Sequence, residues 1–348
     1  MRKKGIFFIG LASGLLLTLT AAFGLSVFFR YTVWDGQKAP NSKIHEIFTL
    51  LDRHSINPYE TDELLENMYR GLLDGVGDPY TYYFDQESLA LFTEQTEGVY
   101  AGIGMVVSID KDDNIVTIVV VYPGTPAERA GLMPGDKIIA VNGLDVTSHR
   151  LEEVTSMVKG KPGTKVNVQI LRPTDEYLFG VDIMRENISV PTVSHKMLDG
   201  VIGYIRIEAF ERVTYGQFVE AFMELSGEKM RGLIIDLRNN PGGLLDTVTQ
   251  ISNMLLPRGV IVYTENKAGE KKYYYSDNNH LEIPMVILVN EGSASASEIL
   301  CGAAKDMGAA DLVGMKTFGK GIVQNLYDLS DGSAIKVTVA KYYTPNGI

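Results

Sequence analysis

The sequence has a single cysteine, Cys301, among its 348 residues, so it cannot form an intramolecular disulfide. Its five histidines are scattered and fit no metal-ligand spacing, and we expect neither a metal nor another cofactor. The chain also lacks an excess of basic residues. Its net charge of −11 argues against nucleic acid as a partner. With 45% apolar and 22% charged residues it is an ordinary globular chain, long enough for two or three domains.

Charge is absent from residues 5–29, which lie between a basic cluster at residues 2–4 and Arg30. This apolar run is long enough to span a bilayer, and the basic cluster predicts a cytoplasmic N-terminus. We therefore expect residues 1–30 to be an uncleaved transmembrane anchor in the cell membrane, with the rest of the chain outside the cytoplasm. The alternative is a signal peptide cleaved near residues 20–22, which would give a secreted or periplasmic protein.

Residues 31–94 read as a linker followed by a helical region. Apolar residues recur at helical spacing over residues 43–53 and again over residues 61–74, with Asn57 and Pro58 between them. These two amphipathic helices either pack on the body of the protein or contact a second subunit.

Residues 95–174 read as a small β module. Short apolar strands are expected over residues 100–107, 114–120 and 166–171, with a helix near 150–158. The segment Gly102-Ile103-Gly104-Met105 stands at its start. Glycines there let consecutive N–H groups converge on a carboxylate, and the strand that follows offers an edge to an extended peptide. A simple tight turn is the alternative.

Residues 175–348 alternate between strands and helices, which predicts an α/β body. Buried strands are expected over residues 200–207, 232–238 and 284–290. The strand at 232–238 leads into a loop with Gly242 and Gly243, whose N–H groups could bind a developing oxyanion. A turn that needs glycine is the alternative. Asp236 and Arg238 have no histidine motif near them and are expected to hold this loop.

The strand at 284–290 is followed by a tight turn containing Ser295 and then by a helix. A serine at such a turn is exposed and lies near backbone N–H groups that stabilise an anion. Alternatively, the S-x-x-E spacing from Ser295 to Glu298 is a capping box that only starts the helix.

Lys320 lies between Gly319 and Gly321, and such a lysine can act as the base for a serine if burial lowers its pKa. Residues 314–320 also match the pattern G-x-x-x-x-G-K of a phosphate-binding loop. Gly321 replaces the required Ser or Thr, however, and a strand-like segment follows, so we do not expect ATP binding.

The segments Gly292–Leu300 and Thr317–Gln324 together resemble the carboxy-terminal processing peptidases, also called tail-specific proteases. The resemblance covers about residues 60–348. It implies Ser295 as nucleophile, Lys320 as general base and Gln324 as the residue that orients the lysine. It includes the motif at residues 77–80, to which we assign no catalytic role.

Two further motifs extend the resemblance. Residues 236–243 resemble the oxyanion loop of the same family, which implies Ala296 N–H as one donor and Gly242 or Gly243 as the other; we favour Gly242. Residues 123–143 resemble a PDZ domain. That likeness implies that Gly102, Ile103, Gly104 and Met105 form a loop that binds the carboxylate of a substrate tail.

The expected fold is therefore α+β and multidomain: a transmembrane helix (1–30), a linker and helical region (31–94), a PDZ domain (95–174) and a serine protease domain (175–348). The resemblance implies that the protease body has the ββα spiral of crotonase-like and Clp-type protease subunits. Family members continue past residue 348, so we expect this domain to be truncated at its C-terminal end.

The expected function is that of a serine endopeptidase that cleaves unfolded or tailed proteins near their C-termini outside the cytoplasm. The PDZ module would bind the substrate tail and gate a Ser/Lys dyad. The family resemblance also favours a homodimer formed through the N-terminal helices. The alternative function is that of a catalytically inactive PDZ scaffold that binds peptides.

Overall fold

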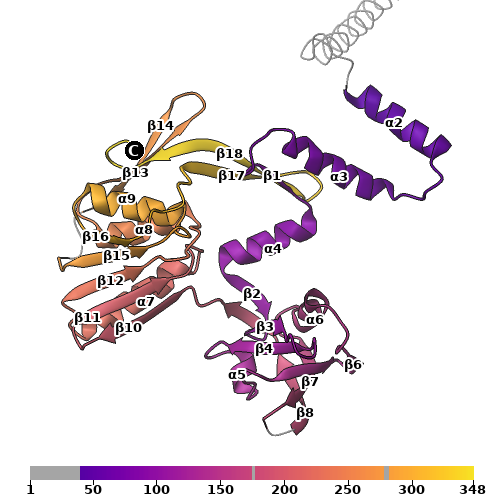
Figure 1. The fold of residues 1–348 in the computed structure, drawn as a ribbon, viewed down its shortest axis with the longest axis horizontal. Coiled ribbons are helices and arrows are strands. Elements are labelled where there is room, and N and C mark those ends of the chain that lie inside the picture. Colours follow the sequence, from indigo (N-terminus) through magenta and orange to yellow (C-terminus); the bar gives the residue numbers. More distant parts are fainter. Residues whose placement is uncertain (1–39, 175–176, 278–281) are drawn as a thin grey trace, which may run out of the picture. The chain divides into compact units, whose positions relative to one another are not determined.

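The computed structural model describes residues 40–174, 177–277 and 282–348 (Figure 1). The chain divides into two compact units between Asn67 and Met68. Helices and strands are labelled as in Figure 1, where the first described helix is α2.

The first unit contains α2 (Pro40–His54) and the start of α3 (Thr61–Asp74), which confirms the two predicted amphipathic helices. Asp62 and Glu63 lie in the first turn of α3, where negative charge interacts favourably with the helix dipole. Ile47 and Leu50 of α2 are about half exposed. The role of these helices in a dimer stays a prediction.

No helix within the described ranges is both long and apolar enough to cross a membrane. The predicted anchor, residues 1–30, lies outside those ranges.

The second unit begins with the rest of α3 and continues with β1 (Tyr82–Phe84) and α4 (Gln86–Glu97). The Asp85 side chain caps α4 by accepting a hydrogen bond of 2.8 Å from Ser88 N–H. Gly98, with φ of 68°, ends the helix in the left-handed conformation. Strand β2 (Val99–Gly102) then pairs with β9 (Glu186–Ser189), so the entry to the middle module and the exit from it lie side by side.

The middle module is a sheet with the order β3-β4-β5-β7-β8, and β6 pairs with β5. Its fully buried core includes Ile118, Val154 and Val168. The sheet extends to Met184, beyond the predicted boundary at residue 174. Its elements are β3 (Met105–Ile109), β4 (Val116–Val121), α5 (Pro126–Arg129), β5 (Lys137–Val141), β6 (Leu144–Asp145), α6 (Leu151–Val158), β7 (Lys165–Arg172) and β8 (Tyr177–Met184).

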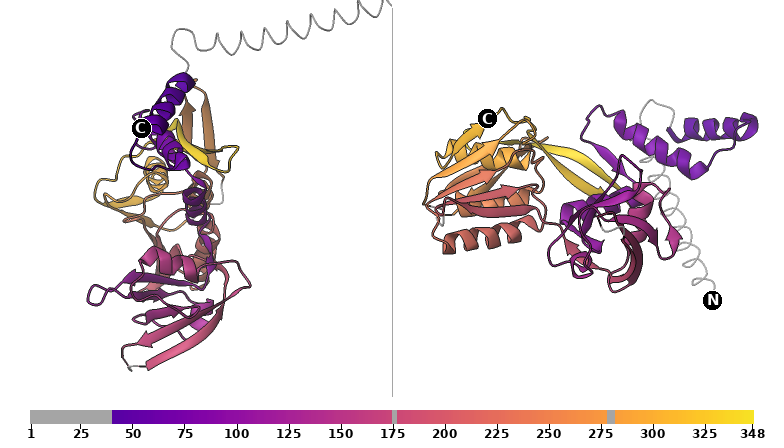
Figure 2. Two further views of the ribbon diagram at one scale, coloured as in Figure 1. Left: turned by 90° about the vertical axis from the view of Figure 1, so that its right-hand side faces the viewer. Right: turned by 60° about the horizontal axis from the view of Figure 1, so that its bottom comes forward.

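The body that follows is built on a sheet with the order β10-β11-β12-β15-β16. Strand β10 is antiparallel to β11, and the other neighbours run parallel, which confirms the predicted α/β character. Helix α7 packs on β10 and β11, as the second view of Figure 2 shows. The elements are β10 (Val193–Leu198), β11 (Ile202–Ile207), α7 (Thr214–Gly227), β12 (Gly232–Asp236), α8 (Leu245–Leu255), β15 (Met285–Val289), α9 (Ala296–Asp306) and β16 (Asp311–Gly314).

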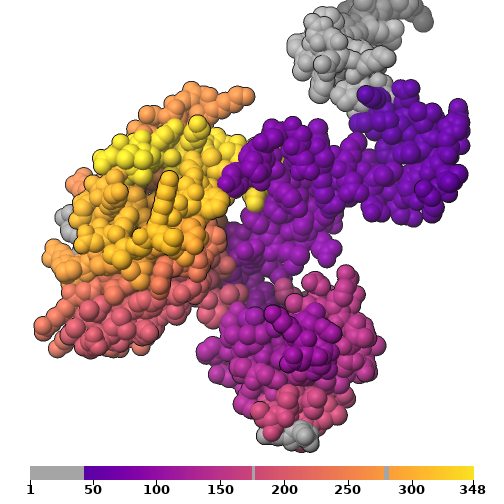
Figure 3. Space-filling view, in the orientation of Figure 1, coloured from indigo at the N-terminus to yellow at the C-terminus, as the bar shows by residue number. Residues whose placement is uncertain are grey.

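A second sheet of the body joins strands that are far apart in the sequence. Its order is β1-β18-β13-β14, with β17 also paired to β18. Strands β13 and β14 lie at the end of the body opposite β10 and α7, as Figures 1 and 3 show. The strands not yet given are β13 (Gly259–Asn266), β14 (Lys271–Ser276), β17 (Ile322–Asp328) and β18 (Ala334–Tyr343). The pairing of β18 with β1 thus joins two segments that are far apart in the sequence.

Candidate active site

Two loops meet at one edge of the parallel sheet. Strands β12 and β15 are parallel neighbours, so the loops that leave their carboxyl ends emerge side by side. The backbone oxygen of Asn240 accepts hydrogen bonds of 3.0 Å from Ala294 N–H and from the Ser297 hydroxyl. The predicted oxyanion loop and the predicted nucleophile turn are therefore in direct contact.

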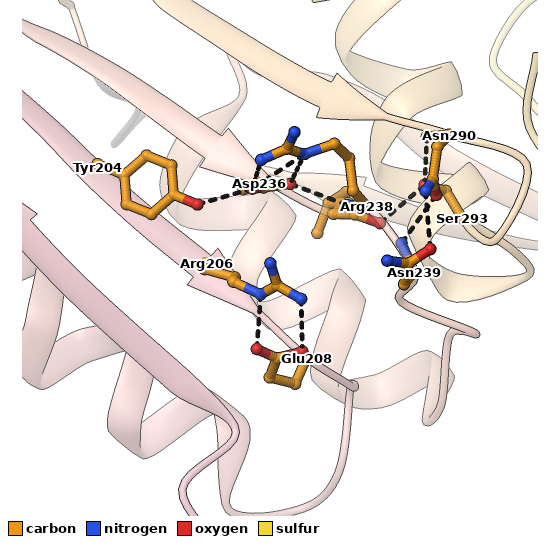
Figure 4. Close-up of polar contacts among 9 residues, drawn as sticks. Tyr204, Arg206, Glu208, Asp236, Arg238, Asn239, Asn290 and Ser293 are labelled. Atoms are coloured by element: carbon orange, nitrogen blue, oxygen red, sulfur yellow. Dashed lines mark hydrogen bonds and ion pairs between the residues drawn. The ribbon is translucent and has the colours of Figure 1, made fainter. Parts of the chain in front are cut away.

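Asn290 fastens the same two loops (Figure 4). Its side-chain oxygen accepts a hydrogen bond of 2.8 Å from Asn239 N–H, and its amide nitrogen donates to the Asn239 side chain at 2.7 Å. The Ser293 hydroxyl donates to Leu237 O at 2.7 Å. These bonds hold the turn in register with the loop.

Asp236 and Arg238 form an ion pair at the start of the predicted oxyanion loop (Figure 4). Asp236 is fully buried. Burial acts to raise the pKa of its carboxyl, but hydrogen bonds from Arg238 and Tyr204 outweigh it and lower the pKa to about 2. The carboxylate stays ionised and anchors the loop, which agrees with the role expected from the sequence.

Ser295 lies immediately before α9, with φ of 53° and ψ of −111°. A residue other than glycine with positive φ is strained, and such strain is common at functional sites. The capping-box spacing is realised here, since Ser295 N–H donates to the Glu298 carboxylate at 2.8 Å. Ser295 is therefore the N-cap residue of α9. Its positive φ, however, is not a conformation that capping a helix requires.

Glu298 also reaches the segment that carries the predicted base. Its two carboxylate oxygens accept hydrogen bonds of 2.6 Å from Gly319 N–H and 2.9 Å from Lys320 N–H. One side chain thus joins the backbone of Ser295 to the backbone of Lys320. Sequence reasoning assigned Glu298 to the capping box alone and missed this second contact.

The Lys320 ammonium group lies in a partly apolar environment. Its Nζ is 4.6 Å from the centroid of the Tyr80 ring and donates a hydrogen bond of 3.3 Å to Gln324 Oε1. Burial lowers the pKa of Lys320 below its usual 10.5, and the negative charge of Asp78 acts against this shift. The lysine therefore loses its proton more readily than an exposed one.

Gln324 is fixed in the orientation that suits Lys320. Its amide nitrogen donates to Tyr80 O, so its amide oxygen is the atom that faces the lysine. Tyr80 contacts the lysine with its ring and the glutamine with its backbone. The motif at residues 77–80, which received no catalytic role from the sequence, supplies this contact.

Ser295, Lys320 and Gln324 line one cavity of about 340 Å³. No direct hydrogen bond joins Ser295 Oγ to Lys320 Nζ within the described ranges, and such bonds often tighten only when substrate binds. The hydroxyl of Tyr342, which also lines this cavity, donates to Ser295 O at 3.1 Å. Glu211 and Lys336 add charges of opposite sign to the lining.

The predicted oxyanion donors Gly242, Gly243 and Ala296 line the same cavity. Gly242 lies against the nucleophile turn, since a Cβ added there would be 2.8 Å from Ala296 N. In this structure Gly242 N–H donates to the Asn240 side chain at 2.8 Å. Neither Gly243 N–H nor Ala296 N–H donates a hydrogen bond in the described part of the chain, so both remain available as donors.

Cys301 is buried in α9, and burial raises the pKa of its thiol to about 12. It is thus unsuited to act as a nucleophile. The described ranges contain no group of three or more His, Cys, Asp or Glu side chains that could hold a metal ion.

The predicted carboxylate-binding loop, residues 102–105, lines a second cavity of about 290 Å³ in the middle module. Gly104 has φ of 91°, and a Cβ there would be 2.2 Å from the Thr125 side chain, so the loop requires glycine. Ile103 is 1% exposed and belongs to the core of the module.

The carbonyl groups of this loop point into the module. Ile103 O accepts a hydrogen bond from Ala127 N–H at 2.8 Å, and Gly104 O accepts one from Tyr122 N–H at 3.0 Å. In a trans peptide the N–H and the C=O point in opposite directions. The N–H groups of Gly104 and Met105 therefore point away from the module core, as binding of a carboxylate requires.

Comparison with known proteins gives two family models. The model of peptidase family S41 matches residues 201–348, and the PDZ domain model matches residues 117–172.

Two curated relatives match most of the chain. The carboxyl-terminal-processing protease of Synechocystis sp. is 38% identical over 294 residues, which cover 83% of this chain and 68% of that protein. The carboxy-terminal processing protease CtpB of Bacillus subtilis is 36% identical over 310 residues, which cover 88% of this chain and 64% of that protein. The chain thus spans roughly two thirds of the length of these relatives.

A solved structure from Bacteroides fragilis, described as an S41 protease, has the same fold with 17% identity and a TM-score of 0.50, covering 80% of this chain and 79% of that one. With the sequence matches, this likeness confirms an α+β S41 protease fold with a PDZ domain. The chain therefore belongs to the carboxyl-terminal processing proteases of peptidase family S41, which are serine peptidases.

Proposed function

We propose that this protein is a serine endopeptidase that cleaves proteins near their C-termini with a Ser/Lys dyad. The observation that carries the proposal is the position of Ser295. It lies in a strained turn and lines the same cavity as a lysine whose pKa is lowered by burial and whose amino group is held by Gln324.

In the proposed reaction, Ser295 Oγ attacks the carbonyl carbon of the scissile bond while neutral Lys320 Nζ takes the hydroxyl proton. The lysine then gives this proton to the leaving amine as the C–N bond breaks. Water, activated by the same lysine, hydrolyses the acyl-enzyme ester and releases Ser295. Gln324 and the Tyr80 ring hold Nζ in place throughout.

The oxyanion of each tetrahedral intermediate needs two N–H donors. Ala296 N–H is open and follows the nucleophile directly. Of the two glycines, Gly243 is the better candidate for the second donor in this conformation, because Gly242 N–H already donates a hydrogen bond to the Asn240 side chain. If Gly242 supplies the second donor, its bond to Asn240 must break when substrate binds.

The PDZ domain is proposed to capture the C-terminal tail of the substrate and to gate the dyad. The N–H groups that point away from its core would bind the terminal carboxylate, and β3 would pair with the extended tail.

Replacing Met105 with Glu places a negative charge within the proposed carboxylate-binding loop. We expect the affinity for a peptide with a free C-terminus to fall by about tenfold or more, because like charges then face each other. Peptide binding by fluorescence anisotropy measures this change. The matched control is Ile109→Glu, which adds the same charge on the same exposed strand outside the cavity lining. Equal affinities for the Met105→Glu and Ile109→Glu variants would contradict tail capture at this loop.

Residues 1–30 are proposed to anchor the protein in the membrane, with the protease outside the cytoplasm. Support comes from the uncharged run at residues 5–29 and the basic cluster before it. Secretion after signal cleavage is the alternative, and the mass of the mature chain purified from cells distinguishes the two.

The proposed function is tested by incubating the full chain, in detergent, with an unfolded protein that ends in an apolar tail. A second substrate ends in an acidic tail. We expect mass spectrometry to find cuts near the C-terminus, with the apolar tail favoured by about tenfold. The Ser295→Ala variant, treated in the same way, gives the background level of fragments. Wild-type protein that produces no more fragments than this variant, while still binding the tail, would contradict the protease and favour the scaffold.

A further inference from the structure

The cavity that holds the dyad contains a second lysine, Lys336, which the proposed mechanism does not use. It lies on β18, where Tyr342 contacts the backbone of Ser295. Lys336 and Tyr342 both line the cavity that also holds Ser295 and Lys320.

The Lys336 amino group has an unusual environment. Its Nζ lies 4.9 Å from the centroid of the Phe92 ring and 5.3 Å from that of Phe84. No carboxylate or other hydrogen-bond acceptor contacts it within the described ranges. Burial lowers the pKa of Lys336, and the charge of Lys320 lowers it further. Aromatic faces attract a cation but leave its N–H donors without acceptors.

A desolvated ammonium with free donors in a substrate cavity stabilises an incoming anion more than a surface lysine does. The chain as a whole carries a net charge of −11, so the positive charge of Lys336 is a local feature of the cavity. The cavity already holds Glu211, whose Oε2 is buried without a hydrogen-bond partner, but no contact joins it to Lys336 in the described part of the chain.

We propose that Lys336 is a specificity-determining residue that binds a carboxylate of the substrate close to the scissile bond. The carboxylate has two sources, the side chain of an Asp or Glu in the substrate and the terminal carboxylate of a short leaving fragment. The inference rests on the proposed protease function, because it assigns a substrate group to the same cavity.

Two kinds of peptide pair test it with the full chain. The first kind of pair has Glu in one peptide and the isosteric Gln in the other, and such a pair is made for each position around the mapped cleavage site in turn. The other pair ends shortly after that site in a free carboxylate or a carboxamide. In the wild type we expect one pair to differ by about tenfold in kcat/KM in favour of the charged member. The pair that differs identifies the source of the carboxylate.

The readout is the kcat/KM of the charged peptide divided by that of its neutral partner. Any loss of folded enzyme lowers both values equally and therefore cancels in this ratio. In Lys336→Met we expect the ratio to fall to about one, and in Lys336→Arg we expect it to persist, since the charge remains. Lys341→Met is the matched control. Lys341 lies on the same strand, exposed and outside the cavity lining, and its loss should leave the ratio unchanged.

A wild-type ratio near one in both pairs, or a ratio that survives in Lys336→Met, would overturn the inference while leaving the protease intact. A wild type that cleaves none of the peptides or unfolded proteins overturns the proposed function and this inference together.

Discussion

Lys320→Ala is expected to lower kcat/KM by on the order of 10⁴-fold or more, and Ser295→Ala by a similar factor, because the two groups act as one unit. Without the lysine, the Ser295 hydroxyl has no base to take its proton. Without the serine, the lysine has nothing to activate. For the same reason the double variant should be no slower than either single one. The measurement is the rate of cleavage of a fluorogenic peptide, with thermal melting as the check on folding.

The pH dependence of the rate is the sharper test of Lys320 as the base. Only the neutral amine accepts a proton, and burial lowers its pKa from 10.5. The rate kcat/KM should therefore rise with pH, level off above the pKa of Lys320 in the folded enzyme, and do so below pH 10.5. Lys320→Arg, which stays charged, should lack this rise. A rate independent of pH from neutral to alkaline conditions, or an additive double variant, would mean that another group is the base.

Gly242→Ala is expected to lower kcat by about 10²-fold or more with a smaller change in KM. The new Cβ would lie 2.8 Å from Ala296 N and 2.7 Å from Ala294 O, both backbone atoms, and the φ of 103° disfavours any residue with a side chain. The loop must shift away from Ala296, which separates the two sides of the oxyanion site. Removing one such donor typically costs 10²- to 10³-fold in kcat.

Gly216→Ala in α7 is the matched control for this substitution. No atom lies within 4 Å of its added Cβ, and alanine is the better helix former, so the rate should not change. If Gly242→Ala kept the wild-type kcat in a folded enzyme, the oxyanion site would have to be elsewhere.

The central part of the site was predictable from the sequence. The apolar runs at residues 232–238 and 284–290 predicted β12 and β15, and the motifs after them placed Ser295, Gly242 and Gly243 in loops. Parallel neighbours bring such loops to one edge of a sheet. The strands and loops followed from local pattern, whereas the roles of Ser295, Gly242 and Gly243 came from the family resemblance.

Two other neighbours of Lys320, Tyr80 and Lys336, were not predictable. Tyr80 and Lys336 come near Lys320 because β1 pairs with β18 and β17 pairs with β18. Antiparallel pairing between residues near 82 and residues near 336 leaves no local pattern in either segment. The contact of Glu298 with the backbone of Gly319 and Lys320 was missed for a different reason. The capping box already accounted for a glutamate at this position, so there was no cause to expect a second role from the sequence.

The choice between Gly242 and Gly243 depended on one side chain. Asn240 is fully buried, and its amide nitrogen donates to Ile207 O at 2.8 Å while its oxygen accepts from Gly242 N–H. The sequence Asn-Pro-Gly-Gly predicts a loop that needs glycine, but it does not fix which N–H group turns inward.

The pairing of β1 with β18 has a consequence for the protein during its synthesis. Gln324 is held by Tyr80 O, and the strand that contacts Ser295 and carries Lys336 is completed only at Tyr343. A ribosome-bound chain that has exposed Ser295 still lacks β18. The nascent polypeptide therefore contains the proposed nucleophile before it can assemble the cavity around it.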